Sequence, residues 1–384
     1  MKFRVERDAF ADAVAWAARS LSARPSIPVL AGLLLAVSDG QHEPLLSVSG
    51  FDLEASTHVE VELAAASPGS ALVSGRLLAD ISRALPPHPV EVAVDGARLT
   101  ISCGSARFTL PTMPVEDYPT LPTMPTTAGS VDSSEFAVAV AQVAVAAGRD
   151  DTLPMLTGVR LEIDGTRLTL AATDRYRLAV RELEWSPVST SSRSPADAQV
   201  LVPARTLADA AKSLSHGDAM TIALSSAASG GEGIIGFSGT SGGRAARATT
   251  RLLDAQFPPY RTLLPTEWSS SAEVPVPALT DAVKRVALVA DRGTPVRLQF
   301  EDNGVALSAG GEDEGRAEEQ LEVRYEGDPI TTAFNPSFLL DGLGALESSD
   351  ARLLFTSPTK PVVLRPADGN HEYTYLIMPV RLPG

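Results

Sequence analysis

The most constraining feature of this chain is a pattern that occurs three times. Apolar residues at helical spacing open each copy: Phe10, Val14, Ala17 and Leu21; Phe136, Val140, Val143 and Ala147; and Leu279, Val283, Val286 and Ala290. Strand-forming stretches follow, and then a second short amphipathic helix with Leu78, Ile81 and Leu85; Leu207, Ala210 and Leu214; or Leu339, Gly342 and Leu346. A period of roughly 125 residues is too long for a solenoid unit and suits a whole domain. We therefore expect three tandem, similar α+β domains built into an object by rotation, such as an arc or a ring.

Two proline-rich stretches suggest where these domains end. The first carries Pro111, Pro114, Pro119, Pro122 and Pro125, and the second runs from Phe257 through Pro265. Proline at this density forbids a regular helix or a central strand. Each stretch contains an aromatic–proline pair, Tyr118-Pro119 or Phe257-Pro258, which supports the repeat. We place the three domains at residues 1–125, 126–265 and 266–384.

Composition narrows the class of protein. The 384 residues carry a net charge of −15, so the exterior should be acidic, which by itself argues against holding nucleic acid through bulk charge. The sole cysteine, Cys103, excludes a disulfide within the chain and a cysteine-based metal site. The sequence has neither a signal-peptide core nor an apolar run of the ~20 residues that a membrane span needs. These features predict a cytoplasmic protein.

Local signals predict several element boundaries. Asp8 is a good N-cap for a helix over residues 8–21, and Asn335 before Pro336 is a strong cap and first-turn signal. Asp95-Gly96 suits a two-residue hairpin turn. The acidic stretch around Glu312, Asp313 and Glu314 lacks the calcium-loop spacing and is read as solvated.

No catalytic constellation is visible in the sequence. The five histidines are scattered and none has metal-ligand spacing. Neither a phosphate-binding loop nor a nucleophile elbow is present. We therefore expect a protein that is not an enzyme and that needs no cofactor and no metal.

Two stretches of the sequence look like functional sites. In the first, Arg175 and Arg177 flank Tyr176 where a strand should turn, and the alternative is an edge hairpin with solvated arginines. The second is the C-terminal run from Tyr373 to Leu382, which contains Met378-Pro379-Val380 and whose alternative is a last core strand with a frayed end.

Specific motifs relate the whole chain to one family. They are Met1-Lys2-Phe3-Arg4-Val5-Glu6-Arg7, Arg24-Pro25-Ser26-Ile27-Pro28-Val29-Leu30, Thr173-Asp174-Arg175-Tyr176-Arg177-Leu178-Ala179, Phe257-Pro258-Pro259-Tyr260-Arg261, Phe334-Asn335-Pro336-Ser337-Phe338 and Met378-Pro379-Val380-Arg381-Leu382. Over essentially its full length, the chain resembles the bacterial DNA polymerase III β subunit, the sliding clamp.

The resemblance implies a homodimer joined head to tail into a closed ring, with helices inside and sheets outside. Such a ring encircles double-stranded DNA of any sequence and tethers the polymerase, and it also docks the clamp loader and repair proteins through short motifs. Retention is then topological, so an acidic chain needs only some arginines in the bore.

The resemblance also implies residue roles. DNA contact falls to Arg24, Arg76, Arg149 and Arg205, while Phe108 and Leu110 of one subunit face Leu288 and Val289 of the other. The alternative for these four apolar residues is the core of their own domains. The implied peptide-binding groove comprises Leu156, Thr173, Arg175, Tyr176, Arg177, Leu178, Pro258, Leu263, Asn335, Phe338, Met378, Pro379, Val380 and Arg381.

The chain departs from the family pattern at a few positions. Arg175 stands where many members have glycine, Thr262 where some have arginine, and Pro383-Gly384 extend the usual end. Two other functions stay open at this point. One is a clamp paralogue with a specialised or resistance role, and the other is a small-ligand-binding protein or enzyme that uses the turn from Thr173 to Arg177.

Overall fold

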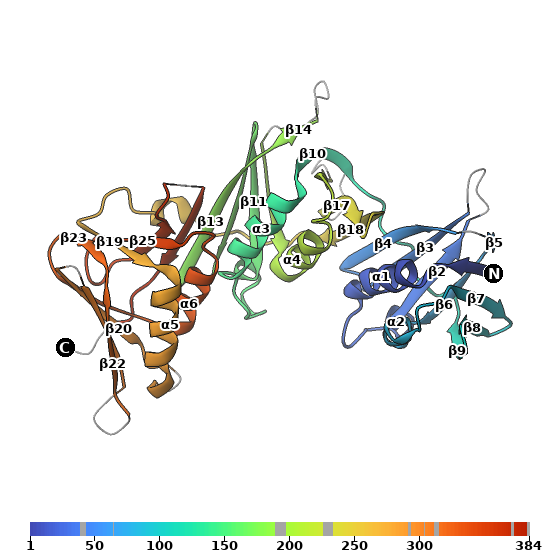
Figure 1. Cartoon of the computed structure of the whole chain (residues 1–384). Helices are drawn as coiled ribbons and strands as arrows, with labels where there is room; N and C mark the ends of the chain where they lie inside the picture. The colour runs from blue at the N-terminus through green and yellow to red at the C-terminus, as the bar shows by residue number, and fades with distance from the viewer. Residues whose placement is uncertain are drawn as a thin grey trace. The chain divides into compact units, whose positions relative to one another are not determined.

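The computed structural model of the chain describes residues 1–38, 44–63, 65–188, 197–225, 233–290, 293–302, 304–310, 315–369 and 372–381. The chain divides into two compact units. Figure 1 labels their helices and strands. The first unit comprises Met1–Ala137, Trp185–Ala196 and Thr206–Leu252, and the second comprises Val138–Glu184, Asp197–Arg205 and Leu253–Gly384.

The first unit is built on one 14-stranded sheet, in the order β14-β10-β16-β17-β18-β4-β3-β2-β6-β9-β8-β7-β1-β5. Its strands are β1 (Lys2–Val5), β2 (Gly32–Val37), β3 (Leu45–Phe51), β4 (Ala55–Glu62), β5 (Ala65–Ser67), β6 (Gly69–Ser74), β7 (Val90–Asp95), β8 (Arg98–Cys103), β9 (Ala106–Met113), β10 (Thr126–Asp132), β14 (Ser186–Pro187), β16 (Ala219–Leu224), β17 (Ile234–Ser241) and β18 (Arg244–Arg251). The helices α1 (Arg7–Ala17) and α2 (Gly75–Ala84) belong to this unit, whereas α3 (Ser133–Ala144) and α4 (Ala204–Ser213) contribute residues to both units.

The second unit holds two sheets. A nine-stranded sheet has the order β15-β11-β12-β13-β27-β26-β25-β19-β23, and a four-stranded sheet has the order β22-β21-β20-β24. The strands are β11 (Gly158–Asp164), β12 (Arg167–Thr173), β13 (Arg177–Glu184), β15 (Asp197–Pro203), β19 (Ser270–Pro275), β20 (Val296–Glu301), β21 (Gly304–Ala309), β22 (Ala317–Glu322), β23 (Arg324–Glu326), β24 (Ile330–Phe334), β25 (Asp350–Phe355), β26 (Val362–Pro366) and β27 (Tyr373–Ile377). Its helices are α5 (Val276–Val286) and α6 (Pro336–Gly344).

The strand orders confirm the threefold repeat. The run β6-β2-β3-β4 has the same connectivity as β15-β11-β12-β13 and β24-β20-β21-β22. A second run, β1-β7-β8-β9, matches β10-β16-β17-β18 and β19-β25-β26-β27. Consecutive repeats join edge to edge, because β4 pairs with β18 in the first unit and β13 pairs with β27 in the second.

Of the two predicted helix caps, Asn335 is confirmed and Asp8 is not. Asn335 caps α6 as predicted, since its Oδ1 accepts a hydrogen bond from the Ser337 amide at 2.9 Å. The prediction for Asp8 is wrong. The first helix begins at Arg7 and ends at Ala17, and Asp8 instead forms an ion pair with Arg7 at 2.5 Å. A carboxylate in the first turn favours the helix dipole without occupying the cap position.

The first hairpin turn differs from the prediction by one residue. Asp95 and Arg98 are the last paired residues of β7 and β8, so Gly96 and Ala97 form the loop. Gly96 adopts a φ of +56°, a conformation that glycine reaches at little cost. The acidic residues Glu312, Asp313 and Glu314, and the extension Pro383-Gly384, lie outside the described residues.

No helix among the described residues is long and apolar enough to cross a membrane. Likewise, no group of histidine, cysteine, aspartate and glutamate side chains in these residues could hold a metal ion. Cys103 is buried as a free thiol.

Candidate functional site

The predicted functional turn connects β12 to β13. Asp174 Oδ1 accepts hydrogen bonds from the amides of Tyr176 and Arg177, both at 3.0 Å. Thr173 Oγ1 donates to the Arg177 carbonyl at 2.6 Å. Arg175 adopts a φ of +79°, which L-residues rarely do. The turn is therefore fixed by its own polar side chains and carries local strain.

The same turn occurs in the first repeat, between β3 and β4. Asp52 Oδ1 accepts from the amides of Glu54 at 3.0 Å and Ala55 at 2.7 Å. Leu53 has a φ of +78°, and within the described residues Leu53 and Arg175 are the two non-glycine residues with positive φ. The strained position thus belongs to the repeated scaffold.

Arg177 is not the solvated arginine that one reading of the sequence predicts. Its side chain is 6 % exposed, Nε donates to Asp174 Oδ2 at 2.9 Å, and Nη1 donates to Asp341 Oδ2 at 2.5 Å. The guanidinium lies 4.5 Å from the Phe338 ring centroid, and Tyr176 stacks on the same ring. Arg177 therefore ties the turn to α6 and is occupied within the chain, whereas Arg175 is exposed.

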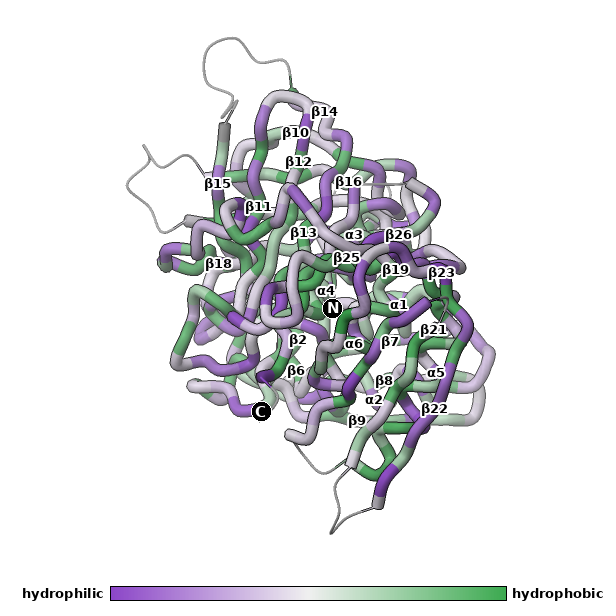
Figure 2. The backbone as a smooth tube through the Cα atoms, turned by 90° about the vertical axis from the view of Figure 1, so that its left-hand side faces the viewer, coloured by the Kyte–Doolittle hydropathy of each residue, from purple (hydrophilic) through white to green (hydrophobic). Residues whose placement is uncertain are grey.

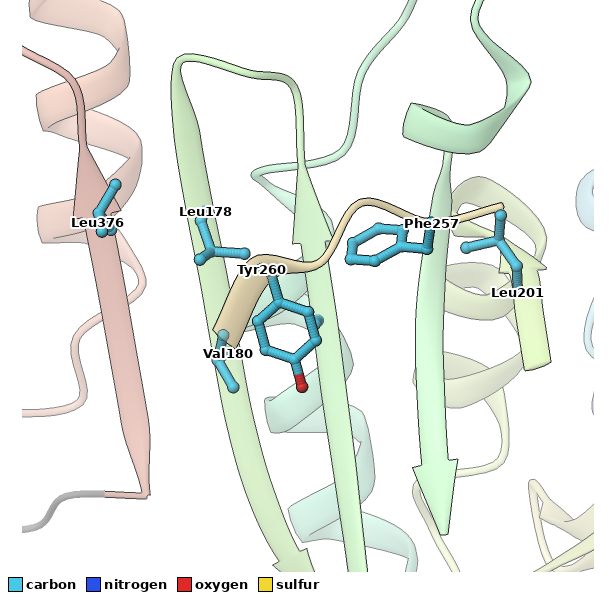
Figure 3. Close-up of a cluster of buried hydrophobic side chains, with 7 residues drawn as sticks. Leu178, Val180, Leu201, Phe257, Tyr260 and Leu376 are labelled. Carbon is cyan, nitrogen blue, oxygen red and sulfur yellow. The ribbon is translucent and has the colours of Figure 1, made fainter. Parts of the chain in front are cut away.

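An apolar cluster lies beside the turn (Figure 3). Its buried members are Ala171, Leu178, Val180, Leu201, Phe257, Tyr260 and Leu376. Leu178 on β13 and Leu376 on β27 are direct cross-strand partners, so the seam between the second and third repeats forms part of the cluster. Phe257 and Tyr260 lie on the segment that crosses β11, β12 and β13, and their ring centroids are 5.9 Å apart in an edge-to-face arrangement.

Only part of this cluster was predicted. Leu178 belongs to it, whereas Leu156 is buried next to Gly148, and Leu263 and Val380 are 49 % and 38 % exposed. The sequence reasoning missed Ala171, Val180, Leu201, Phe257, Tyr260 and Leu376 as site residues. The available signal was the Phe257-Pro258-Pro259-Tyr260 motif, which the sequence analysis uses as a linker and as a family motif but not as part of a site.

The C-terminal tail runs past the turn. The Met378 amide donates to the Tyr176 carbonyl and the Val380 amide to the Ala333 carbonyl, each at 2.8 Å. Met378 and Val380 nevertheless leave 37 % and 38 % of their surface exposed, and Tyr176 leaves 56 %. Exposed apolar side chains on a fixed backbone are typical of a docking surface. Among the other predicted groove residues, Arg381 is exposed, while Pro258, Asn335, Phe338 and Pro379 are partly buried and Thr173 is buried.

The four predicted DNA-contacting arginines are all exposed. Arg24 and Arg76 lie in the first unit, and Arg149 and Arg205 lie in the second. Within the part of the chain that the structure describes, none forms an ion pair with a carboxylate. Arg285 differs from them, because Glu319 binds it through two hydrogen bonds of 3.0 and 2.5 Å.

The four residues expected at a subunit interface have different environments. Leu288 is 83 % exposed and Val289 is partly exposed. Leu110 on β9 is 1 % exposed, so its side chain belongs to the core of its own domain, as the alternative reading expects. Phe108, two residues earlier on the same face of the strand, is partly buried.

Comparisons with known proteins agree with this architecture. The chain matches the DNA polymerase III beta subunit family through its N-terminal domain at residues 1–122, its central domain at 130–259 and its C-terminal domain at 261–381. It is 57 % identical to the beta sliding clamp of Streptomyces coelicolor, with 100 % of both chains covered. It is 44 % identical to the beta sliding clamp homolog GriR of Streptomyces muensis, with 99 % of both covered.

A solved structure has the same fold over its full length. The DNA polymerase III subunit beta from Pseudomonas aeruginosa matches with a TM-score of 0.86 at 30 % identity, covering 100 % of both chains. The repeated fold and these likenesses define a sliding clamp, an accessory component of replication with no catalysis of its own. The chain belongs to the DNA polymerase III beta subunit family.

Proposed function

We propose that two copies of this chain close head to tail into a ring that encircles duplex DNA and tethers the replicative polymerase. The main support for this proposal is that the repeat leaves two strand edges available for pairing with another strand. The edge strand β22 is the counterpart of β4 and β13, and β9 is the counterpart of β18 and β27. In both internal seams such strands pair with each other.

The two open edges have complementary character. Within the described residues, β22 ends its sheet without a partner, and β9 pairs on its second side only through Thr112 and Met113. The exposed side chains of β22 are Glu318, Gln320 and Glu322, and Figure 2 shows this strand as largely hydrophilic. Arg107 is exposed on β9. Charged edges prevent unspecific aggregation, and opposite charges favour pairing of β9 with β22 of a second copy.

DNA contact in the bore would be weak and independent of sequence. The exposed arginines Arg24, Arg76, Arg149 and Arg205 supply charges for phosphate contact, while the net charge of −15 argues against retention by bulk attraction. A ring should remain on closed circular DNA and slide off linear DNA. Equal loss from both, measured by gel filtration, would contradict encirclement. Such a ring would act in the cytoplasm, where bacterial DNA is replicated.

We further propose that partners dock on the exposed tail, the turn and the apolar cluster. The groove would comprise Leu156, Thr173, Arg175, Tyr176, Arg177, Leu178, Pro258, Leu263, Asn335, Phe338, Met378, Pro379, Val380 and Arg381, with Arg177 holding the turn in place. It would take short segments with glutamine and leucine or phenylalanine anchors from the polymerase α subunit, the clamp loader and repair proteins. A few anchors in a groove suggest an affinity near 1 μM, or about −8 kcal/mol.

Removal of residues 378–382 tests this site. The truncated chain should lose peptide binding in fluorescence anisotropy and remain dimeric in light scattering. Because the tail also bonds to the Tyr176 and Ala333 carbonyls, Val380→Asp serves as a milder variant that keeps the backbone. Unchanged peptide affinity in both variants would place the site elsewhere.

The domain boundaries 1–125, 126–265 and 266–384 remain part of the proposal. The alternative function is a clamp paralogue with a resistance role, for which the likeness to GriR is the motive. The higher identity to the Streptomyces coelicolor clamp, 57 % against 44 %, favours the replicative role. Deletion of the gene decides between them, because only a replicative clamp should be essential.

A further inference from the structure

A polar cavity adjoins the apolar cluster on the side away from Leu178. Its volume is about 700 Å³, within the ~300–1,000 Å³ range of ligand pockets. The charged residues that line it are Arg160, Arg167, Arg261, Glu162 and Asp164. Strands β11, β12 and β15 and the segment of residues 259–262 provide the walls.

Tyr260 forms a wall of both the cavity and the apolar cluster. Its ring packs in the cluster, with Phe257 edge-on at 5.9 Å, and its hydroxyl donates to Glu162 Oε2 at 3.1 Å. The cation of Arg160 lies 5.9 Å from the Phe257 ring centroid. A chain bound on the cluster would therefore need to pass only one ring to place its next side chain in the cavity.

Glu162 is fully compensated within the cavity wall. Arg261 Nη2 donates to its Oε2 at 2.6 Å, and Arg160 Nε lies 2.6 Å from its Oε1. Burial raises the pKa of the Glu162 carboxyl, but the hydrogen bond from Arg261 and the two arginine charges outweigh burial and leave the pKa lowered. Two arginine charges thus balance the Glu162 charge, which weakens its repulsion of a second carboxylate that enters the cavity.

Two arginines keep donors available at the mouth of the cavity. The Arg261 side chain is 62 % exposed, and within the described residues only its Nη2 forms a hydrogen bond. The Arg167 side chain is 64 % exposed and has one distant partner, Glu182, at 3.4 Å. A planar guanidinium with free N–H groups binds a carboxylate through two parallel hydrogen bonds.

The charge of the cavity lining favours an anion. Three arginines face two carboxylates, whereas the cavity lined by Glu273, Glu322 and Asp350 and the cavity lined by Glu301, Glu318 and Glu319 each carry more carboxylates than arginines. In a chain of net charge −15, a lining with an excess of arginine favours an anion. We propose that this cavity is a carboxylate subsite that receives an aspartate or glutamate side chain flanking the apolar anchors of a docked partner. This inference rests on the proposed peptide-docking function.

Matched peptides test the proposal. The probes share glutamine, leucine and phenylalanine anchors and carry either glutamate or glutamine at flanking positions on each side. With the dimeric protein at low salt, we expect one glutamate peptide to bind roughly fivefold tighter than its glutamine counterpart. The advantage should vanish in Arg261→Gln and at high salt, and should fall in Arg167→Gln, which leaves Glu162 untouched. Arg19→Gln, an exposed arginine of the first repeat outside the cavity and outside β9 and β22, is the control and should retain it.

The outcomes separate the two levels of the proposal. If glutamine and glutamate peptides bind wild type equally well, the carboxylate subsite is wrong while docking on the apolar cluster stands. An advantage that survives both Arg261→Gln and Arg167→Gln would also overturn the subsite. If no peptide binds at all, the docking function and the subsite both fail.

Discussion

At the residue scale, Arg175 shows how the scaffold sets a local conformation against the preference of the side chain. The Asp174 carboxylate fixes the turn, and the residue after it must take the left-handed conformation. For an L-residue this conformation costs about 1–2 kcal/mol relative to glycine. We expect Arg175→Gly to raise the free energy of unfolding by about 1 kcal/mol, measured by thermal or urea unfolding. Arg175→Ala keeps the Cβ and should give no such gain, and a destabilised Arg175→Gly protein would contradict the role of strain.

Arg177 marks what the sequence could and could not predict about single residues. The motif pointed to this arginine, but its burial depends on Asp341, which lies 164 residues away in the sequence. By contrast, the Asn335 cap was predictable because its partner, the Ser337 amide, is two residues away. A hydrogen bond between residues that are close in sequence can be predicted from the sequence, whereas the burial of a charged side chain depends on the distant element that covers it.

We expect Arg177→Ala to destabilise the protein by about 3 kcal/mol, because it leaves Asp174 and Asp341 without their shared cation. Denaturant unfolding followed by tryptophan fluorescence measures the change. The matched control is Arg316→Ala, whose side chain is 72 % exposed and whose loss should matter by less than about 0.5 kcal/mol. Equal effects of the two substitutions would show that the buried network contributes little.

At the scale of elements, the sequence predicted the order of helices and strands well and their ends less well. The hydrophobic period identified the helices, yet α1 begins at Arg7 and not at the expected cap Asp8. Both proline-rich stretches were expected to lack regular structure, and this is wrong at two places: β9 continues through Pro111 to Met113, and Tyr260–Leu263 form a short 3-10 helix. Proline content also gave no sign that Phe257 and Tyr260 are buried against the sheet. That contact depends on β11, β12 and β13, which are distant in sequence.

The contact of this segment with the sheet should depend on pH through Glu162. Because Arg261 and Arg160 hold the folded-state pKa of Glu162 below its unfolded value near 4.5, its contribution is complete above that value and is lost as pH falls through the folded pKa. We expect hydrogen exchange in residues 257–264 to be slow at neutral pH and to accelerate below about pH 4.5. Glu162→Gln should exchange faster at neutral pH and lose the acid step. An identical pH profile in both proteins would refute the assignment.

At the scale of the whole molecule, the proposed ring depends on the threefold repeat more than on any single site. Two seams within the chain pair an edge of one repeat with an edge of the next, and β9 and β22 remain for a third seam. The sequence could predict the repeat, because each copy carries the same apolar pattern. It could not predict which edges stay open, because the ladder partners of a strand depend on long-range pairing.

We expect Leu288→Asp to convert the dimer into a monomer at micromolar concentration. The side chain is 83 % exposed in the single chain, and its burial at a seam would make a charge there costly. Light scattering coupled to gel filtration measures the mass. Trp268→Asp is the matched control, since Trp268 is 48 % exposed just before β19, outside the strands β9 and β22 and the residues around Leu288 that would form the seam, and this variant should stay dimeric. Dimeric Leu288→Asp protein would remove Leu288 from the interface.

Encirclement and electrostatic contact make separate contributions to DNA binding, and they can be measured apart. The variant with Arg24, Arg76, Arg149 and Arg205 changed to glutamine removes four exposed charges, and light scattering first establishes that it is still dimeric. Each lost phosphate contact should reduce the slope of log K against log salt on linear duplex by about 0.9. Once loaded on nicked circular DNA by its clamp loader, however, the variant should be retained as long as wild type, and linearising the circle should release both. If the variant leaves circular DNA quickly, charge and not topology holds this clamp. An unchanged salt slope on linear DNA would instead show that other residues contact the phosphates.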